Sequence, residues 1–538
     1  MKEKIVFVTP EIAIIPDLHT YSGGLGVVSG SFSLSARKFG LPVVFISILP
    51  RQGLYEQGLD TYGMTISYKQ YFYDWALEDA GLVPISVCGS PTYVRVWRLV
   101  AEKFNSAEVL FLDCDIPEND ELSRKNSLQL YGGSFHSGST MERKAAYSDV
   151  LAKGSIAALR HLGYSVKLYH INESYGAFLP LMLLLEKLKE GIPLKAALDF
   201  VRACTVFTTH TSLDAGNPKY NTDMVAKMTG VHDINLLNAL GGDPFNMAVA
   251  AARLSSRTNS VSQSHLSVLE NSWQLLFTGT ELVSVTNGVS SDFWQSPEFR
   301  NIKNAKELAK VKARSKTSGI KYLQEKFGIC LNPDAPILVW ARRFAEYKRP
   351  TLLFHDLGWL RNHFERSGLQ VILSGKPHPD DKPMIEAWNW IYRIAKELPH
   401  LFILPEYEPL EMGRILRCTA DIWLNTPRPR LEACGTSGMS ANMNGTLQVS
   451  SRDGWVLESD PQQVFLFGGE VSNNDNMDAE DMRKVLDCAL NIFSNKPEVW
   501  YEMALQAKYE AEERWTSDRM LRDYYSILYR LDLDSDCT

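Results

Sequence analysis

The sequence lacks any pair of cysteines at the C-x-x-C spacing that zinc sites and redox-active disulfides use. Its eight cysteines are widely scattered, at positions 88, 114, 204, 330, 418, 434, 488 and 537. Scattered cysteines are typical of reduced thiols in the cytoplasm rather than of a disulfide framework. We therefore expect neither a disulfide-stapled fold nor a zinc site built on cysteine.

Long hydrophobic runs are also missing. The longest apolar run, Leu179–Leu185, is followed directly by Glu186 and Lys187, and it is far shorter than the ~20 residues that a bilayer span needs. This run predicts a buried helix. The N-terminal sequence Met1–Thr9 leads straight into a strand pattern without the features of a signal peptide. We predict a cytoplasmic protein with no membrane span.

An excess of positive charge is absent as well. The 56 lysines and arginines are outnumbered by 63 aspartates and glutamates, which gives a formal net charge of −7. Because binding to nucleic-acid phosphates requires a basic excess, no nucleic-acid partner is expected. At 538 residues, the chain exceeds the ~250–300 residues at which single hydrophobic cores stop growing, so it should form more than one domain.

Short apolar, β-branched runs alternate with helical patterns throughout the chain. Near-continuous apolar strands separated by helices are typical of parallel sheets covered on both faces. Functional loops are then expected at the carboxyl ends of the strands. The predicted strands are 5–9, 42–49, 93–99, 109–114, 166–171, 205–209 and 282–286 in the first half, and 337–341, 369–373, 402–404, 422–424 and 446–449 in the second.

The two sets of strands meet near residue 290 and predict an α/β protein. We expect two doubly wound, Rossmann-like domains that face each other across a cleft. The first domain is placed at residues 1–290 and the second at 291–511. The lysine-rich segment 301–330 predicts a solvated helix at the boundary. A helical pattern continues to the C-terminus, where residues from about 512 to 538 are expected to cross back and complete the first domain.

A glycine-rich loop, 20–30, lies between the first predicted strand and a helical pattern. Its glycines, among them Gly24, allow a backbone to approach a ligand closely, and a helix start favours an anion. This signal is weak by itself, because many glycine-rich segments are only turns.

The segment 341–350 concentrates positive charge directly after a predicted strand. Four cationic residues fall within a stretch of eight, although the protein as a whole is acidic. They are Arg342, Arg343, Lys348 and Arg349. Arginine offers a planar fork to phosphate oxygens, and lysine offers a point charge. The segment predicts an electropositive pocket, and the alternative interpretation is a solvated charged loop.

Three further residues are candidates by type and position. His210 follows a predicted strand, Asn287 precedes a glycine, and Glu432 stands before a predicted helix. Each also has an ordinary structural explanation. A histidine at a strand end is usually structural, an Asn-Gly pair commonly forms a turn, and a glutamate stabilises a helix start.

The segment 432–445 reads Glu-Ala-Cys-Gly-Thr-Ser-Gly-Met-Ser-Ala-Asn-Met-Asn-Gly. It resembles the pattern Glu-Ala-Ser-Gly-Thr-(Ser/Gly)-(Gly/Asn)-Met-Lys of glycogen and α-glucan phosphorylases, in which the lysine forms a Schiff base with pyridoxal phosphate. Here Ser440 occupies the lysine position, and no lysine lies from Glu432 to Arg452. Since a hydroxyl cannot form an imine, the resemblance implies the fold of that family without its usual cofactor anchor.

The resemblance covers nearly the whole chain and implies a GT-B fold. The chain is similar to the shorter bacterial and archaeal α-glucan phosphorylases in five further motifs, at 112–119, 130–133, 170–173, 374–379 and 421–425. Its departures cluster near the expected site. Besides Ser440, they are Ser134, where an aspartate is usual, and Ser174-Tyr175, where Gly-His is usual.

The resemblance also implies roles for the candidates. Residues matching Arg343 and Lys348 grip the substrate phosphate, and the same spacing grips the distal phosphate of nucleotide sugars in many retaining transferases of this fold. The residue matching His210 faces the transferred sugar, and its backbone carbonyl supports positive charge at the anomeric carbon. The implied sugar contacts come from His210, Asn287, Glu432, Cys434 and Gly435.

Two adjacent phosphates beside a sugar, as in a phosphorylase with its cofactor, resemble the diphosphate of a nucleotide sugar. We therefore predict a retaining hexosyltransferase that uses a nucleotide-sugar donor without pyridoxal phosphate. The predicted catalytic residues are His210, Arg343, Lys348 and Glu432. The predicted diphosphate-binding residues are Gly24, Arg343, Lys348, Gly435 and Thr436. No metal is expected, because the Asp-x-Asp pair Asp113 and Asp115 falls in the first domain and is interpreted as structural.

Two alternatives remain open. One is an α-glucan phosphorylase that holds pyridoxal phosphate without a covalent bond, and the other is a catalytically silent glucan-binding protein. The acceptor is expected to be a small molecule or an oligosaccharide. A homodimer is expected only by analogy with phosphorylases.

Overall fold

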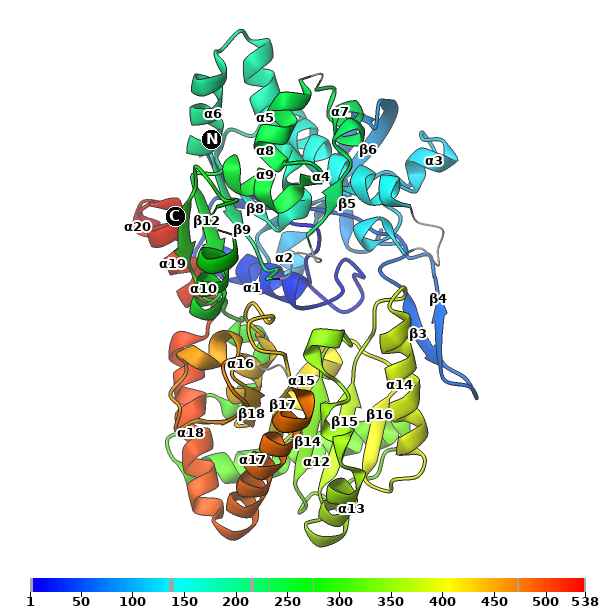
Figure 1. Ribbon diagram of the computed structural model, residues 1–538, viewed down its shortest axis with the longest axis vertical. Coiled ribbons are helices and arrows are strands. Elements are labelled where there is room, and N and C mark those ends of the chain that lie inside the picture. The colour runs from blue at the N-terminus through cyan, green and yellow to red at the C-terminus, as the bar shows by residue number, and fades with distance from the viewer. Residues whose placement is uncertain are drawn as a thin grey trace. The chain divides into compact units, whose positions relative to one another are not determined.

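The computed structural model describes residues 3–134, 140–212, 217–231, 233–273, 275–471 and 474–536. The chain forms two compact units (Figure 1). The first unit contains Met1–Leu54, Tyr68–Thr286 and Met520–Thr538, and the second contains Tyr55–Ser67 and Asn287–Arg519. The segment 55–67 therefore belongs to the second unit, although the sequence placed it in the first domain, and the final crossover begins at residue 520 rather than near 512.

In the described part of the first unit, nine strands form one sheet in the order β13-β12-β9-β8-β1-β2-β7-β6-β5. The seven strands from β13 to β7 run parallel, whereas β6 runs antiparallel to both of its neighbours. The strands are β1 (Lys4–Val8), β2 (Val43–Ile48), β5 (Leu77–Val87), β6 (Ser90–Leu99), β7 (Glu108–Asp113), β8 (Val166–Asn172), β9 (Thr205–Thr208), β12 (Arg257–Ser260) and β13 (Glu281–Ser284).

The expectation of parallel strands is thus wrong at one edge of this sheet. The hairpin of β5 and β6 forms that edge, and much of β5 is exposed or half-buried. An edge strand with one solvated face lacks the continuous apolar run of a buried parallel strand. This difference explains why the sequence did not predict β5.

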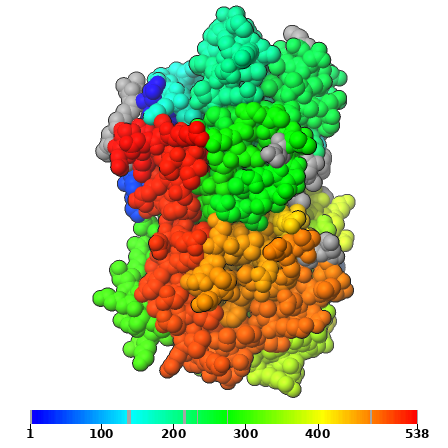
Figure 2. Space-filling view, turned by 60° about the vertical axis from the view of Figure 1, so that its left-hand side comes forward, coloured from blue at the N-terminus to red at the C-terminus, as the bar shows by residue number. Residues whose placement is uncertain are grey.

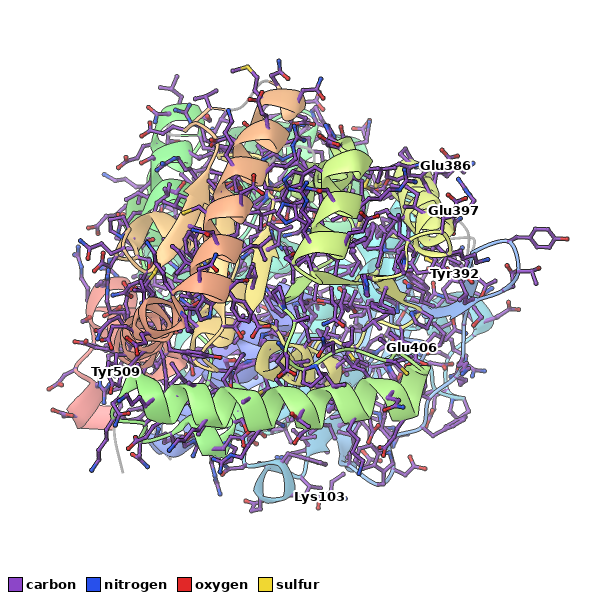
Figure 3. All side chains as sticks on the ribbon, turned by 90° about the horizontal axis from the view of Figure 1, so that it is seen from below. Lys103, Glu386, Tyr392, Glu397, Glu406 and Tyr509 are labelled. Atoms are coloured by element: carbon purple, nitrogen blue, oxygen red, sulfur yellow. The ribbon has the colours of Figure 1, made fainter. Side chains whose placement is uncertain are left out.

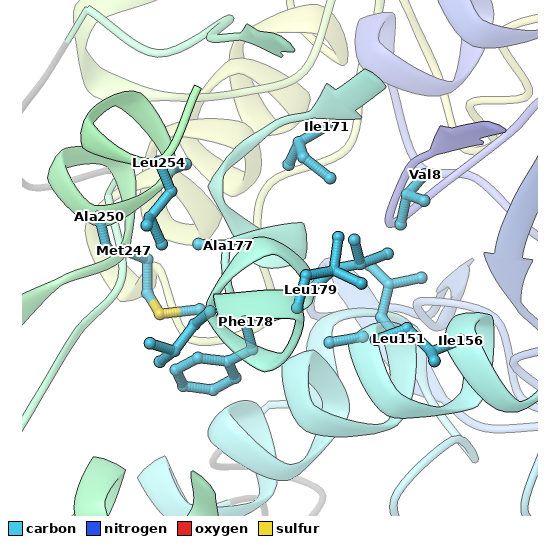
Figure 4. Close-up of a cluster of buried hydrophobic side chains, with 14 of the residues drawn as sticks. Val8, Leu151, Ile156, Ile171, Ala177, Phe178, Leu179, Met247, Ala250 and Leu254 are labelled. Carbon is cyan, nitrogen blue, oxygen red and sulfur yellow. The ribbon is translucent and has the colours of Figure 1, made fainter. Parts of the chain in front are cut away.

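Helices of the first unit cover its sheet and bury its longest apolar run. Phe178, Leu179, Leu181 and Leu184 of α5 are buried, and Figure 4 shows Phe178 and Leu179 packed among side chains from α4 and α9. The predicted buried helix is therefore confirmed. The longer helices are α1 (Gly24–Lys38), α4 (Met141–His161), α5 (Phe178–Lys189), α6 (Leu194–Ala203), α7 (Thr222–Thr229), α8 (Ile234–Gly241), α9 (Met247–Arg253) and α10 (Gln263–Ser272).

Six parallel strands form the main sheet in the described part of the second unit, in the order β16-β15-β14-β17-β18-β19. The chain builds one side outward from β14 and then returns to build the other side from β17, so the strand order reverses between these two strands. The predicted strands of this half are confirmed, and β19 was not predicted. The strands are β14 (Ile337–Ala341), β15 (Gln370–Ser374), β16 (Leu401–Leu404), β17 (Ile422–Asn425), β18 (Leu447–Ser451) and β19 (Val464–Phe467).

The helices of the second unit pack on this sheet and on each other. α12 packs against α15 and α18, and α17 packs against β18 and β19. The helices are α11 (Ser291–Trp294), α12 (Ala305–Phe327), α13 (Leu357–Arg366), α14 (Lys382–Ala395), α15 (Glu411–Thr419), α16 (Ser437–Asn442), α17 (Asp475–Asn495) and α18 (Pro497–Arg514). A small hairpin of β3 (Glu56–Leu59) and β4 (Met64–Ser67) completes the unit.

The prediction that the lysine-rich segment is a solvated helix is wrong for one face of α12. Lys312 and Lys316 are buried. The ammonium group of Lys316 pairs with Asp421 at 2.7 Å, and that of Lys312 donates hydrogen bonds to backbone carbonyls and to Thr446. Charge alone predicted exposure, whereas these lysines are buried because each has polar partners.

Both ends of α12 have polar partners on the neighbouring elements. Figure 3 shows Tyr509 near the start of α12, where its hydroxyl donates to the carbonyl of Ile302 at 2.9 Å. At the other end of the helix, Lys326 pairs with Glu406 at 3.3 Å. These contacts, with the buried lysines, attach α12 along its length.

The C-terminal segment contributes to the core of the first unit. α19 (Ser517–Asp523) leads into the π-helical turn η9 (Tyr524–Tyr529). Met520, Tyr524 and Leu528 are buried in the same cluster as Phe7 and Phe45 of β1 and β2. The turn η9 contacts β12 and β13, and Figure 2 shows this C-terminal segment (red) beside green residues of that region. Among the described residues, none of the helices combines the length and apolar character that a membrane crossing requires.

Candidate functional site

The charged residues of the second unit gather where the strand order of its sheet reverses. β14 and β17 are paired neighbours, and each is followed by a candidate segment. Arg342, Arg343 and Lys348 follow β14, and Glu432 follows β17. Ligands of doubly wound sheets usually bind at such a switch point, outside the carboxyl ends of the strands.

Glu432 is the central carboxylate of this cluster. Its Oε2 accepts hydrogen bonds from Arg342 Nη2 at 2.7 Å and from Lys348 Nζ at 2.5 Å. Burial raises the pKa of Glu432, but the charges of Lys348, Arg342 and Arg343 outweigh it and lower the pKa to about 2. Within the described residues no hydrogen bond reaches Oε1 of Glu432, so this oxygen is open to a ligand.

Arg342, which was not among the predicted site residues, makes the direct contact with the carboxylate. Arg342 is buried, and its Nη1 has no hydrogen-bond partner among the described residues. Arg343 is exposed, although its charge still lowers the pKa of Glu432. Neighbouring side chains of an extended segment point to opposite sides, so the Arg-Arg pair could have indicated that one of the two turns inward.

Gly435 and Thr436 place a stretch of backbone against the same cluster. Gly435 has φ +85, and a Cβ there would lie 3.3 Å from Glu432 Cγ and 3.6 Å from Arg342 Nη2. Such a positive φ favours glycine. Thr436 precedes the short helix α16, and both residues are half-buried. Their backbone is therefore close to the cations and still accessible.

Cys434 and Asn287 lie together in the second unit. The Asn287 backbone hydrogen-bonds to the Cys434 thiol, whose pKa burial raises well above its usual value. The carbonyl of Asn287 accepts a hydrogen bond from Arg519 Nη2 at 3.0 Å. Cys434 is thus a protonated, buried thiol, and its environment is not that of a nucleophile.

Ser440 is buried and is hydrogen-bonded to an arginine that the sequence analysis missed. Its Oγ accepts from Arg417 Nε at 2.5 Å and donates to the carbonyl of Ser437 at 3.0 Å. Arg417 lies on α15, and its guanidinium stacks near the rings of Trp294 and Trp423, at 4.3 and 5.0 Å from their centroids. No sequence signal pairs residues 417 and 440, because the contact depends on how two helices pack.

His210 lies in the first unit and is held in place by its neighbours. Its backbone N–H donates to Glu173 Oε1 at 2.7 Å, and its ring Nε2 is hydrogen-bonded to Asn172 Oδ1 at 2.8 Å. Burial and the nearby His265 lower the pKa of His210 to about 3. Glu173 itself has φ +77, a conformation that non-glycine residues adopt mainly under structural constraint. The imidazole is therefore neutral at physiological pH.

Gly24 is the first residue of α1, also in the first unit. A Cβ at this position would meet no atom within 4 Å. The amides of Ser22 and Gly26 in the same loop donate to the buried carboxylate of Glu11 at 2.6 and 2.9 Å. Two amides of the predicted anion-binding loop are thus already paired with an internal carboxylate.

The Asp-x-Asp pair of the first unit is paired with arginines. Asp113 accepts from Arg51 at 2.8 Å, and Asp115 accepts from Arg124 at 2.7 Å. Across the residues that the structure describes, His, Cys, Asp and Glu form no group of three or more placed to hold a metal ion. Of the predicted site residues, His210 and Gly24 lie in the first unit and all the others lie in the second.

Comparison with known proteins gives two family matches. Residues 4–274 match the starch synthase catalytic domain, and residues 295–491 match carbohydrate phosphorylase. A relative from Methanocaldococcus jannaschii, an uncharacterized protein, is 34% identical over 97% of this chain and 98% of its own length.

Two relatives with named activities match along almost the whole chain. The maltodextrin phosphorylase of Thermococcus litoralis is 28% identical over 98% of this chain and 70% of its own length. The glycogen synthase of Streptococcus pneumoniae is 22% identical over 98% of this chain and 99% of its own length. Together with the two parallel α/β sheets, these matches confirm the predicted fold class and the predicted resemblance. The chain belongs to the GT-B family of glycosyl-transferring proteins that includes the carbohydrate phosphorylases and the starch synthases.

Proposed function

We propose that this protein is a retaining hexosyltransferase that takes its hexose from a nucleotide sugar and works without pyridoxal phosphate. One observation carries the proposal. The position of the cofactor lysine holds Ser440, whose hydroxyl is hydrogen-bonded to the buried guanidinium of Arg417. A hydroxyl cannot form an imine, and the guanidinium of Arg417 lies in contact with this hydroxyl. These residues therefore do not fit a covalently bound pyridoxal phosphate.

The charges of the second unit support a dianionic donor. Arg342, Arg343 and Lys348 surround the carboxylate of Glu432. The carboxylate of Asp453 accepts from the backbone amide of Glu432, so three cations face two carboxylates and the cluster keeps a net positive charge. In this proposal Arg343 and Lys348 bind the distal phosphate. The backbone at Gly435 and Thr436 binds the proximal phosphate.

The proposed reaction exchanges one bond at the anomeric carbon for another. The bond between this carbon and the diphosphate oxygen breaks, and the acceptor oxygen bonds to it on the same face. The acceptor proton passes to the leaving phosphate oxygen, and a nucleoside diphosphate is released. Lys348 and Arg343 stabilise the charge that develops on the leaving group.

Polar groups around the sugar complete the proposed site. Oε1 of Glu432 would accept a hydrogen bond from a sugar hydroxyl, since Oε2 is held by Arg342 and Lys348. Asn287 would bind a second hydroxyl, with Cys434 and Gly435 alongside. The backbone carbonyl of His210 would support positive charge at the anomeric carbon. Because cationic side chains serve the diphosphate, we expect full turnover in the presence of EDTA.

Release of nucleoside diphosphate from a panel of UDP-, ADP- and GDP-hexoses tests the proposal, with maltodextrin and glycogen as the first acceptors. The wild-type protein should turn over at least one donor, and the product should keep the anomeric configuration. Lys348→Ala and Arg343→Ala should each lower turnover by orders of magnitude. Near-normal turnover in both variants would exclude this mechanism.

A phosphorylase that holds pyridoxal phosphate without a covalent bond is the second candidate. The matches to carbohydrate phosphorylase and to the maltodextrin phosphorylase favour it. It requires that the isolated protein carry cofactor absorbance and cleave maltodextrin only when inorganic phosphate is present. Observing both would replace the nucleotide-sugar proposal.

A further inference from the structure

Arg417 is a buried cation that the proposed reaction doesn't use. The residue is 7% exposed, and its Nε donates to Ser440 Oγ. No carboxylate of the described residues lies within ion-pair distance of its guanidinium. Three neighbouring buried cations differ from Arg417, because each of them has a carboxylate partner. Arg342 and Lys348 share Glu432, and Lys316 pairs with Asp421.

The space around the guanidinium is shaped for it. Trp294 and Trp423 lie at 4.3 and 5.0 Å, within the range of cation–π contact. Trp423 is fixed in turn by a hydrogen bond from its Nε1 to Ser437 Oγ at 3.3 Å. A Cβ at Gly413 would lie 2.5 Å from Arg417 Nη1, so a larger residue there would displace the guanidinium.

An apolar side chain would fill the space between two indoles without the cost of desolvating a charge. Burial lowers the pKa of Arg417 to about 10, although Glu408 acts in the opposite direction from beyond ion-pair distance, so the side chain remains a cation at neutral pH. A buried, unpaired cation is costly unless a ligand supplies the missing anion. The lack of a partner at Arg417 therefore favours an anionic ligand.

Arg417 lies near the residues assigned to the proximal phosphate. Ser440, to which it is hydrogen-bonded, stands one helical turn after Thr436. The charges of Arg417, Arg342 and Arg343 all act on the phenol of Tyr407, so the three guanidinium groups are close to one side chain. Arg342 Nη1 is a buried donor without a partner among the described residues.

We propose that Arg417 binds a phosphoryl group, with Ser440 as the positioning residue that orients its guanidinium. Nε is held by Ser440, and the Nη groups donate to the proximal phosphate of the donor beside Gly435 and Thr436. The identification of that phosphate as part of a nucleoside diphosphate rests on the proposed function. Pyridoxal phosphate and inorganic phosphate present the same chemistry, and the experiment separates these sources.

The test measures the binding of UDP, ADP, GDP, pyridoxal phosphate and inorganic phosphate to the full-length protein by isothermal titration calorimetry. Arg417→Met removes the charge and keeps a long side chain between the indoles. We expect this variant to bind the ligand of the wild type with an affinity at least ~10-fold lower, which is the effect of losing a charge-assisted hydrogen bond. Arg417→Lys should recover part of the affinity, and Ser440→Ala should show a smaller loss.

Arg414→Met is the matched control, because Arg414 is an exposed arginine on the same helix. It should leave affinity unchanged. Without ligand, the midpoint of thermal unfolding of Arg417→Met should equal or exceed that of the wild type, since no carboxylate loses a partner. A lowered midpoint with unchanged affinity would overturn the proposal and make Arg417 a structural residue.

The wild-type result separates this proposal from the proposed function. If a nucleoside diphosphate binds equally well to the wild type and to Arg417→Met, the assignment of Arg417 fails and the nucleotide-sugar function stands. If only pyridoxal phosphate or inorganic phosphate binds, and Arg417→Met abolishes that binding, Arg417 remains a phosphoryl-binding residue and the nucleotide-sugar function fails.

Discussion

The two units differ in the net charge around their candidate residues. In the first unit, the carboxylates of Glu11 and Glu173 accept hydrogen bonds from backbone amides, and His210 is neutral. In the second unit, the carboxylate of Asp453 likewise accepts from the backbone amides of Leu431 and Glu432, but Arg342 and Lys348 also converge on the carboxylate of Glu432. Internal carboxylates thus shape loops in both units, and only the candidate cluster of the second unit adds an excess of cations.

This difference in charge suits the two units to different roles in ligand binding. A neutral imidazole and amides already paired with Glu11 contribute position and dipoles but little net charge. A cluster with more cations than carboxylates attracts an anion and stabilises negative charge as it develops. We infer that recognition of the donor phosphates depends mainly on the second unit, and that the first unit positions its groups by hydrogen bonding.

The largest expected effect tests that division directly. Lys348→Ala should lower turnover by ~10²–10³-fold, because it removes the cation that stabilises the leaving group in the proposed reaction. His210→Gln should cost much less, since the proposed role of His210 lies in its backbone carbonyl. Steady-state release of nucleoside diphosphate measures both variants. A larger loss for His210→Gln than for Lys348→Ala would break the comparison.

Acid should destabilise the two units over different pH ranges. Burial lowers the pKa of His210 and of His265 from 6.5 to about 3, so the unfolded chain takes up these protons first and stability falls as pH drops from 6.5 towards 3. The pKa of Glu432 falls from 4.5 to about 2. Its contribution, on the order of 3 kcal/mol, is kept above pH 4.5 and lost only below it.

Hydrogen exchange measured at a series of pH values reads the two units separately. Peptides around His210 and His265 should lose protection at a higher pH than peptides around Glu432. Glu432→Gln should reduce the acid dependence of the peptides around residue 432 and leave that of the first unit unchanged. Loss of protection in the opposite order would contradict the assigned pKa shifts.

A smaller effect is expected from Gly435→Ala. The positive φ and the close approach to Glu432 Cγ should together destabilise the protein by about 1–2 kcal/mol. Gly328→Ala is the matched control, because Gly328 has φ +70 but no atom within 4 Å of an added Cβ. Urea unfolding of the two variants should show the greater loss for Gly435→Ala. Equal losses would mean that the contact with Glu432 does not matter.

The smallest effect on stability is expected at Arg343. Because its side chain is exposed, Arg343→Ala should change the free energy of unfolding by less than about 0.5 kcal/mol. Its turnover should still fall by orders of magnitude. Arg342→Ala should destabilise the protein clearly, since it removes a buried partner of Glu432. A variant of Arg343 that unfolds as readily as Arg342→Ala would show that Arg343 is a structural residue.

The predictable part of the fold was the part with a regular apolar pattern. Buried parallel strands such as β14 and β17 are continuous apolar runs, and their positions follow from the sequence. The edge strand β5 was not predicted, because its side chains are largely exposed or half-buried. The burial of the lysines of α12 was not predicted, because their hydrogen-bond partners come from distant segments.

The same limit applies to the candidate site. A sequence motif indicates which residues of a segment are functional candidates. Two motifs indicated Lys348 and Glu432, and the structure places these two residues in contact. A motif doesn't indicate which of two adjacent arginines turns inward. It also could not indicate that Arg417 would meet Ser440, because that contact joins α15 to α16 through tertiary packing.

The C-terminal crossover has a consequence for the order in which the protein forms during translation. Met520, Leu521, Tyr524, Tyr525, Leu528 and Tyr529 belong to the same core as Phe7, Phe32 and Phe45. A nascent chain that has left the ribosome as far as residue 519 therefore holds every residue of the second unit, but it still lacks part of the interior of the first. The first unit, most of which is synthesised before the second, therefore completes its hydrophobic core last.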